Sequence, residues 1–110
     1  MKQGEIWEMN FDPVKGSEQG GRRPAVIISG NLMNEYLNVV IVCHLTTKIK
    51  NYKGNLILEP DEKNGLEMKS EVLTFHIRSV AKDRLKNKLG SISKKNVEFI
   101  KSTLNDILRY

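Results

Sequence analysis

The chain reads Gly16-Ser17-Glu18-Gln19-Gly20-Gly21-Arg22-Arg23-Pro24-Ala25-Val26-Ile27-Ile28 where a glycine-rich segment passes into an apolar run. The β-branched residues of that run favour a buried strand. Pro24 biases Arg23 toward extended backbone, which puts this arginine at the end of the loop or the start of the strand. A guanidinium on a strand beside a glycine-rich loop suits phosphate recognition, because its planar fork donates two parallel hydrogen bonds.

The same stretch has the glycine spacing of a nucleotide-binding P-loop, between Gly16 and Gly21. However, Arg22 and Arg23 stand where that motif requires Lys followed by Ser or Thr. A β-branched run behind a proline follows, whereas the motif needs a helix whose N-terminus faces the phosphates. The sequence therefore excludes a P-loop.

Size and composition predict a single globular domain over residues 1–110. A chain of this length buries one sizeable core, and 28% charged with 39% hydrophobic residues is ordinary for a globular protein. The N-terminus lacks the apolar core of a signal peptide, and the longest apolar runs, such as 39–43, are too short to span a membrane. We therefore expect a cytoplasmic protein with no membrane partner.

Cysteine and histidine are scarce, so neither a disulfide nor a metal site is expected. Cys43 is the only cysteine, which fits a reducing compartment. Only Cys43, His44 and His76 offer sulfur or nitrogen ligands, and their spacing resembles no zinc site. We predict no metal and no cofactor.

The positive charge lies in the last third of the chain. Residues 76–110 hold nine Lys or Arg against three Asp or Glu, whereas residues 1–75 hold nine against ten. A basic region attracts nucleic acid or an acidic protein. Taken alone, such a region is more often a solvated, lysine-rich face, so charge leaves the function open.

Hydrophobic periodicity predicts a mainly β fold with a C-terminal helix. Alternating or continuous apolar runs indicate strands over 6–11, 25–29, 39–43, 55–59, 71–77 and 88–92, with a loop or short helical turn over 30–38. Trp7 sits inside an apolar strand and is expected in the core.

The end of the chain changes to helical periodicity. Ser93 is available as an N-cap, and the apolar stripe that follows is most simply the helix face that packs on the sheet, through Val97, Ile100, Leu104, Ile107 and Leu108. Short strands followed by one helix predict a small curved sheet or barrel capped by that helix.

An ordered set of motifs spans the whole chain. They are Gly4-Glu5-Ile6-Trp7, Phe11-Asp12-Pro13, Gly16-Ser17-Glu18-Gln19, Gly21-Arg22-Arg23-Pro24, Leu45-Thr46-Thr47 with Lys50, Ser70-Glu71-Val72-Leu73, Ile77-Arg78-Ser79 and Arg84-Leu85. In these motifs the chain resembles the MazF/PemK-type toxins of type II toxin–antitoxin systems. The resemblance implies a homodimer of SH3-like barrels, the MazF/CcdB-like toxin fold. It also implies a metal-independent endoribonuclease that cuts single-stranded RNA at short sequences and is neutralised by a cognate antitoxin covering its RNA-binding groove.

Carried over residue by residue, the resemblance makes Arg23 and Thr46 the catalytic pair. Glu18 and Gln19 match the loop that helps to close over the substrate. After the threonines, cations interleaved with one aromatic ring suit an unstructured RNA. The substrate-binding candidates are Ser17, Glu18, Gln19, Arg22, Thr47, Lys48, Lys50 and Tyr52.

The chemistry expected of these residues is attack by the ribose 2′-hydroxyl, which leaves a 2′,3′-cyclic phosphate and a 5′-hydroxyl. Arg23 can stabilise the charge that develops on the phosphate, and Thr46 can donate a hydrogen bond to it. An arginine, with a pKa above about 12, is poorly matched to accept the 2′ proton. The resemblance would let Arg23 act as both acid and base, and Glu18 is an alternative base or a substrate contact.

Two positions depart from the pattern of the relatives. His44 stands where they usually have proline, two residues before Thr46, and either assists proton transfer or satisfies local hydrogen bonds. Phe75-His76 replaces a polar pair, which we expect to alter the dimer seam, the antitoxin contact or the RNA sequence cut. Strand alternation puts His76 opposite Phe75 and Ile77. His44 and His76 are therefore possible auxiliary residues.

Other readings remain open at this point. A non-catalytic toxin of the gyrase-poison type uses a C-terminal Trp-Gly-Ile, whereas this chain ends Ile107-Leu108-Arg109-Tyr110. A non-catalytic SH3-like RNA-binding module would bind RNA without cutting it. In that case Arg23 could be a surface ion-pair partner, and the Thr46 hydroxyl could bond its own turn.

Overall fold

One bent antiparallel sheet carries the fold of this computed structural model, which describes residues 1–10 and 22–110. In chain order the elements are β1 (Glu5–Asn10), β2 (Arg22–Ile27), α1 (Asn31–Tyr36), β3 (Val39–Thr46), β4 (Ile57–Leu58), β5 (Ser70–Ala81), the 3₁₀ turn η1 (Lys82–Arg84), β6 (Leu85–Ser91) and α2 (Lys94–Arg109). Neither α1 nor α2 is both long and apolar enough to cross a membrane.

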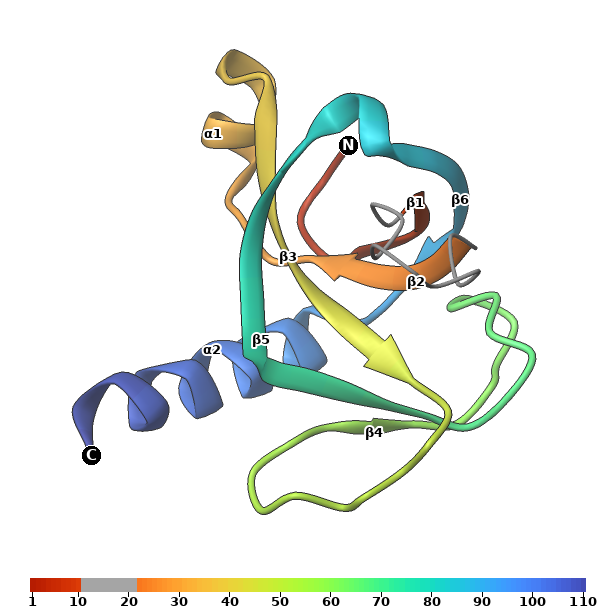
Figure 1. The fold of residues 1–110 in the computed structure, drawn as a ribbon, viewed down its shortest axis with the longest axis vertical. Coiled ribbons are helices and arrows are strands. Elements are labelled where there is room, and N and C mark those ends of the chain that lie inside the picture. Colours follow the sequence, from red (N-terminus) through yellow and green to blue (C-terminus); the bar gives the residue numbers. More distant parts are fainter. Residues whose placement is uncertain (11–21) are drawn as a thin grey trace, which may run out of the picture.

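The strands follow the order β4-β5-β3-β2-β1-β6, and each neighbouring pair runs antiparallel. The sheet curls so that β5 and β6, which lie on two sides of it, are joined by the arch of η1 (Figure 1). The pairing register shifts between Val42 and His44 on β3 and at two places on β1. Such bulges bend a strand and increase its twist. The predicted fold, a mainly β SH3-like barrel with a C-terminal helix, is confirmed.

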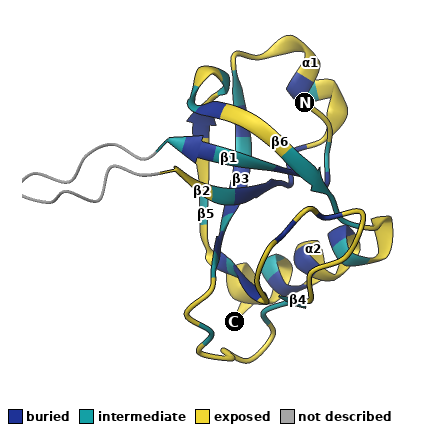
Figure 2. Ribbon diagram, turned by 90° about the vertical axis from the view of Figure 1, so that its right-hand side faces the viewer, coloured by how far each residue is buried: buried dark blue, intermediate teal, exposed yellow. Residues whose placement is uncertain are grey.

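Strand alternation divides the apolar residues between two clusters, one on each face. Ile6 and Val26 pair directly and belong to the first cluster, which α2 covers through Ile100. Ala25 and Ile27 belong to the second cluster, inside the curl. Both faces of the central strands are thus buried, as the colouring of Figure 2 shows, which explains their nearly continuous apolar sequences.

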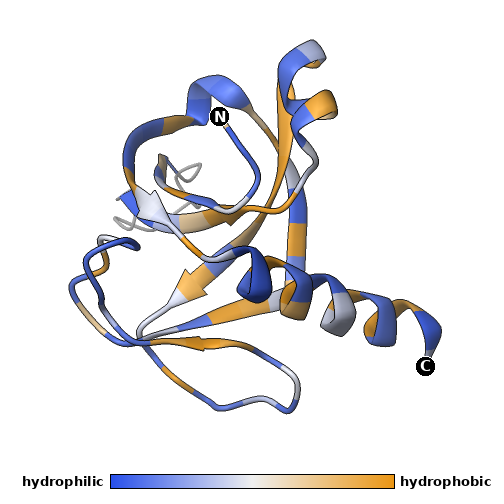
Figure 3. Ribbon diagram, turned by 180° about the vertical axis from the view of Figure 1, so that it is seen from behind, coloured by the Kyte–Doolittle hydropathy of each residue, from blue (hydrophilic) through white to orange (hydrophobic). Residues whose placement is uncertain are grey.

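The C-terminal helix begins as predicted but extends past the sheet. The Ser93 Oγ accepts a hydrogen bond from the Asn96 N–H at 3.1 Å, which is the expected N-cap. Ile107 is 45% exposed and Leu108 is 79% exposed, so the prediction that they pack on the sheet is wrong. Figure 3 shows the reason: the last turns of α2 project beyond the strands.

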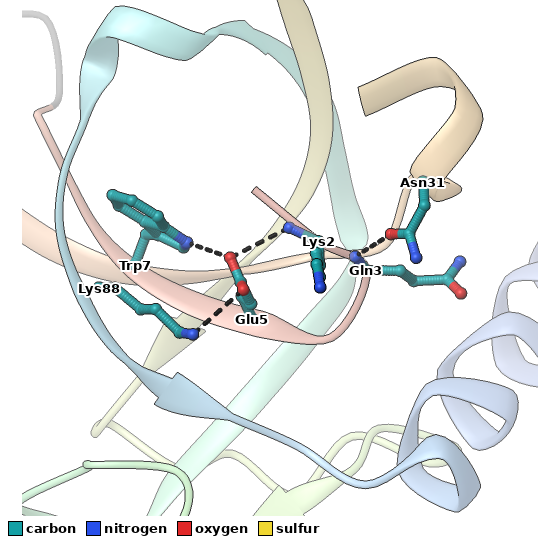
Figure 4. A network of polar contacts seen from close by, with 6 residues as sticks. All are labelled: Lys2, Gln3, Glu5, Trp7, Asn31 and Lys88. Carbon is teal, nitrogen blue, oxygen red and sulfur yellow. Dashed lines mark hydrogen bonds and ion pairs between the residues drawn. The ribbon is translucent and has the colours of Figure 1, made fainter. Parts of the chain in front are cut away.

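A network around Glu5 fixes the start of the chain (Figure 4). Its carboxylate accepts hydrogen bonds from the Lys2 N–H at 3.0 Å and from Trp7 Nε1 at 2.9 Å, and it pairs with Lys88 Nζ at 3.1 Å. Burial alone would raise the pKa of this carboxyl, but these partners outweigh it and lower the pKa. Trp7 packs against the second cluster, which confirms its predicted core position.

Some strands begin or end at other residues than predicted, because hydrogen-bonded pairing with a neighbouring strand, and not apolar sequence, determines where they begin and end. β2 begins at Arg22, because Arg22 and Arg23 pair with Asn10 and Met9 of β1. The short helical turn predicted over 30–38 is present as α1, whereas the strand predicted over 55–59 is reduced to Ile57–Leu58. Residue 11, the last of the first predicted strand, lies outside the described residues.

The crossing of β6 over the segment before β5 requires glycine. A Cβ added at Gly90 would lie 2.1 Å from the Lys63 carbonyl oxygen, whereas one at Gly30 would meet nothing within 4 Å. We predict that Gly90→Ala lowers the free energy of unfolding by about 1–3 kcal/mol, and Gly30→Ala by less than about 1 kcal/mol. Urea denaturation measures both, and equal losses would contradict this contact.

Candidate active site

A cleft of about 470 Å³ opens beside the second apolar cluster and is rich in basic groups. Its lining residues come from β2, β3 and β5 and are Arg23, His44, Leu45, Thr46, Leu73, His76, Ile77 and Arg78. A second hollow of about 310 Å³ shares Arg23, Leu45 and Thr46 and adds Pro24, Thr47 and Lys48. Together they form a groove across the ends of β2 and β3, and none of its described lining residues is acidic.

Strand register explains why Arg23 and Thr46 meet. Ala25 lies opposite His44 in the β2–β3 pair, and the same antiparallel register continued by two residues brings Arg23 opposite Thr46. Residues two apart on a strand point to the same face of the sheet. Arg23 is two residues from Ala25, and Thr46 is four residues from Val42, so both side chains lie on the face of the second apolar cluster, where the cleft opens. A sheet, rather than a loop, therefore positions this pair.

Register also brings Arg78 and His76 to the cleft. Arg78 lies opposite Val42, on the face of the second cluster, and His76 follows two residues away. The rings of His76 and His44 meet edge to face with centroids 6.4 Å apart. Ile77 packs against the first cluster, as the alternation predicts. The Phe75 ring, however, lies 4.5 Å from the His76 ring, so the prediction that these two side chains face opposite ways is wrong, since a register shift interrupts the alternation here.

His44 is half-buried and lies among positive groups. Burial, followed by the charges of Arg78, His76 and Arg23, lowers its pKa to about 4. His44 is consequently a neutral imidazole at pH 7, a form that can accept a proton.

The Thr46 hydroxyl has the local contact expected of a turn. Its Oγ1 accepts a hydrogen bond from the Lys48 N–H at 3.1 Å. That bond uses an oxygen lone pair, so the hydroxyl proton can still be donated toward the cleft. The turn therefore orients Thr46 and leaves it competent for a phosphate contact.

The basic loop between β3 and β4 is organised by Glu71, which has no exposed surface. Its carboxylate accepts hydrogen bonds from the backbone N–H groups of Lys50, Asn51 and Tyr52 at 2.8, 3.0 and 2.9 Å. Asn55 Nδ2 donates a further bond at 3.0 Å. Burial would raise the pKa of this carboxyl, but the loop's hydrogen bonds outweigh it and lower the pKa.

The far side of the loop is tied to the C-terminal helix. Thr103 Oγ1 donates a hydrogen bond of 2.6 Å to the Gly54 carbonyl oxygen. Gly54 has φ +89°, a backbone conformation that glycine adopts without strain. The loop is thus held at both sides by buried or helical residues.

The structure brings most of the predicted site residues together. Those lining the two hollows are Arg23, His44, Thr46, Thr47, Lys48 and His76, while Lys50 and Tyr52 lie on the loop that Glu71 holds. Arg22 is exposed at the start of β2 and lines neither hollow. Ser17, Glu18 and Gln19 lie outside the described residues.

Sequence reasoning missed two residues of the site. Arg78 was not a candidate, although its two-residue spacing from the apolar Val80 indicates the cluster face. Glu71 was not a candidate either, although an acid inside an otherwise apolar strand signals a buried polar contact. Within residues 1–10 and 22–110, no three His, Cys, Asp or Glu side chains lie close enough together to hold a metal ion.

Comparison with known proteins gives concordant matches over nearly the whole chain. Residues 2–108 match the family described as PemK-like, MazF-like toxin of type II toxin-antitoxin system. Endoribonuclease MazF of Staphylococcus saprophyticus is 36% identical over 106 residues, 96% of this chain and 88% of that protein. Endoribonuclease toxin MazF of Escherichia coli K12 is 31% identical over 103 residues, 94% of this chain and 88% of that protein.

Solved structures agree with the sequence matches. A MazE-MazF crystal structure (Form-II) from Deinococcus radiodurans superposes with a TM-score of 0.84 at 28% identity, covering 99% of this chain and 96% of that one. The curled sheet, the terminal helix and the basic cleft thus define a protein of the toxin class. Within that class, the chain belongs to the PemK-like, MazF-like toxins of type II toxin-antitoxin systems.

Replacing the Glu71 carboxylate tests its role in the loop. In Glu71→Gln one acceptor oxygen becomes an NH₂ group that faces N–H donors, so we expect a loss of about 1–3 kcal/mol in the free energy of unfolding. Glu67→Gln, at an exposed position of the neighbouring loop, is the control and should change little. Denaturant unfolding at pH 7 measures both, and similar values would contradict the role of Glu71.

The same pair of variants has a defined pH dependence. Because folding lowers the pKa of Glu71, its stabilisation is complete above the ordinary pKa of a glutamate. That stabilisation is lost as the pH falls through the lowered value. The stability difference between wild type and Glu71→Gln should therefore shrink in acid, and a difference that grew in acid would overturn the assignment.

The electrostatics of His44 can be measured directly. We expect its imidazole to titrate in the RNA-free protein with a pKa of about 4, because burial and three positive neighbours disfavour the charged ring. NMR of labelled histidine side chains, with His44→Gln used to assign the signal, gives this value. A His44 pKa near the ordinary value of a histidine would contradict its burial in the cleft.

Proposed function

We propose that this chain cleaves single-stranded RNA without a metal, using Arg23 and Thr46 as its catalytic pair. The chain is an endoribonuclease toxin of a type II toxin–antitoxin system, in keeping with its curated relatives. The observation that supports the mechanism is that Arg23 of β2 and Thr46 of β3 line one cleft together with Arg78 of β5.

The proposed reaction is an internal transfer at the phosphate. The 2′-hydroxyl oxygen attacks phosphorus and gives up its proton to a base, while the bond from phosphorus to the 5′ oxygen breaks and that oxygen takes up a proton from Arg23 or from water. The products are a 2′,3′-cyclic phosphate and a 5′-hydroxyl. Arg23 and Arg78 stabilise the negative charge that grows on the phosphate oxygens. Thr46 donates a hydrogen bond that fixes the phosphate for in-line attack.

The proton of the 2′-hydroxyl needs an acceptor, for which we propose His44 as a candidate beside Arg23, the base that the family resemblance implies. His44 is neutral at pH 7, because burial first, and then the charges of Arg78, His76 and Arg23, lower its pKa to about 4. A bound phosphate places negative charge beside those arginines and so raises the basicity of His44. His76 lines the same cleft as an auxiliary group, and Glu18 remains the alternative base.

The remaining components of the proposal concern partners and compartment. The similarity to a MazE-MazF crystal structure supports a cognate antitoxin that covers the groove. The basic residues that line the groove favour contact with an acidic segment of that antitoxin. We also propose a homodimer and a cytoplasmic location, the latter supported by an RNA substrate and by the buried, free thiol of Cys43.

Cleavage of a long single-stranded RNA in excess EDTA tests the reaction. Wild type should give discrete fragments with 5′-hydroxyl ends, and Arg23→Ala should lower the rate by about 10²- to 10³-fold, the usual loss when one charge-stabilising donor is removed. Arg109→Ala, at the exposed end of α2, is a matched control expected to cut like wild type. Thr46→Ala and His44→Ala should each slow cleavage.

Three results would count against the proposal. Intact RNA with folded, antitoxin-free wild type would favour a binding-only module of the same fold. Equal cleavage by Arg23→Ala would indicate a contaminant or a different catalytic residue. Activity that EDTA abolishes would require a metal.

A further inference from the structure

A row of four aromatic rings leads out of the cleft. Its first step joins His44 to His76, whose centroids lie 6.4 Å apart, and the next joins His76 to Phe75 at 4.5 Å. Phe75 then meets Tyr52 of the basic loop at 5.3 Å, and all three contacts are edge to face. The row therefore runs from the half-buried cleft to the solvent.

The outer two rings are exposed although they are held in place. Phe75 is 46% exposed and Tyr52 is 49% exposed, and neither belongs to the two apolar clusters. Phe75 lies on β5, and the Tyr52 backbone N–H is bound by Glu71 at 2.9 Å. Rings that are already ordered lose little further entropy when a ligand stacks on them.

The surroundings of these rings favour a ligand that is both aromatic and anionic. Lys50 and Lys53 flank Tyr52 on the same loop, while Arg78 lies three residues from Phe75 at the cleft. Aromatic faces combined with backbone-tracking cations are the means by which proteins hold unpaired nucleotides. A purely apolar partner would gain nothing from the cations.

We propose that Tyr52 and Phe75 form a stacking platform for the unpaired base of a nucleotide next to the scissile one, and that this platform restricts which base is accepted there. The proposal rests on the proposed function, because it takes the phosphate bound by Arg23 and Thr46 as the point of cleavage. Stacking on a planar ring tolerates several bases, so we expect a graded base preference at this position rather than an absolute requirement.

Two measurements test the platform with the full-length protein. First, cut sites in a long RNA are mapped for wild type, Phe75→Ala and Tyr52→Ala. Tyr36→Ala is the control, since Tyr36 is an exposed aromatic on α1, at the end of the sheet away from β4 (Figure 1). We expect base preference to weaken at one position beside the cut in the two platform variants only.

Second, binding is measured with a short single-stranded RNA that carries 2-aminopurine at that position and a 2′-deoxy sugar at the cut, which removes the nucleophile. Wild type should quench the 2-aminopurine fluorescence. Phe75→Ala and Tyr52→Ala should bind roughly 5- to 150-fold more weakly, the usual loss for one base–aromatic stack. Phe75→Trp and Tyr52→Phe keep a ring and should restore both affinity and quenching.

The outcomes separate this proposal from the proposed function. Unchanged cut profiles and affinities in both alanine variants overturn the platform while leaving the nuclease intact. A wild type that binds and quenches but never cuts overturns the nuclease and leaves the platform. A third outcome is that Phe75→Ala sediments as a monomer where wild type sediments as a dimer, while Phe75→Trp and Tyr52→Phe fail to restore quenching. In that case a second copy of the chain covers the two rings, and the platform is wrong.

Discussion

The carboxylate of Glu71 is the interaction on which the functional end of this molecule depends. An ionised group without exposed surface is costly to bury, and it is tolerated here because four donors of the loop surround it. The bonds run from β5 to a segment about twenty residues earlier in the chain. One buried charge thereby orders a loop of lysines and polar residues that follows Lys48, the last residue of this segment lining the groove.

Strand pairing performs a similar task for Arg23 and Thr46, the two residues that we propose as catalytic. Arg23 and Thr46 belong to strands separated by α1, yet the antiparallel pairing of β2 with β3 brings both to one cleft at the end of the second apolar cluster. The bulge after Val42 then shifts β5 relative to β3, so that Leu73 rather than His76 lies opposite His44. Apolar packing in the curl therefore fixes the geometry of charged side chains beyond it.

The parts of the fold that sequence predicted are those with local signals. The apolar runs around Val26 and Val42, and the helical stripe after Ser93, were sufficient to locate two central strands and α2. The exposure of Leu108 could not be foreseen, because periodicity reports which face of a helix is apolar and not how far its partner sheet extends.

The site shows the same division. The motifs contain all four residues, but they gave a role only to Arg23 and Thr46. The positions of Glu71 and Arg78 beside the site follow from the pairing of β3 with β5. An acidic residue in a strand is buried only where a loop from elsewhere in the chain packs against it and donates hydrogen bonds to its carboxylate. That information is absent from local sequence, since the partner is non-local in the chain.

The hydrogen bond from Thr103 to Gly54 has a consequence for synthesis on the ribosome. Chains fold as they emerge, N-terminal segments first, but here the last helix fastens the loop beside Thr46 and covers the first apolar cluster. A nascent chain that has exposed β1 to β5 still lacks these restraints. The loop that follows Thr46 is therefore fully restrained only once α2 has folded onto the sheet.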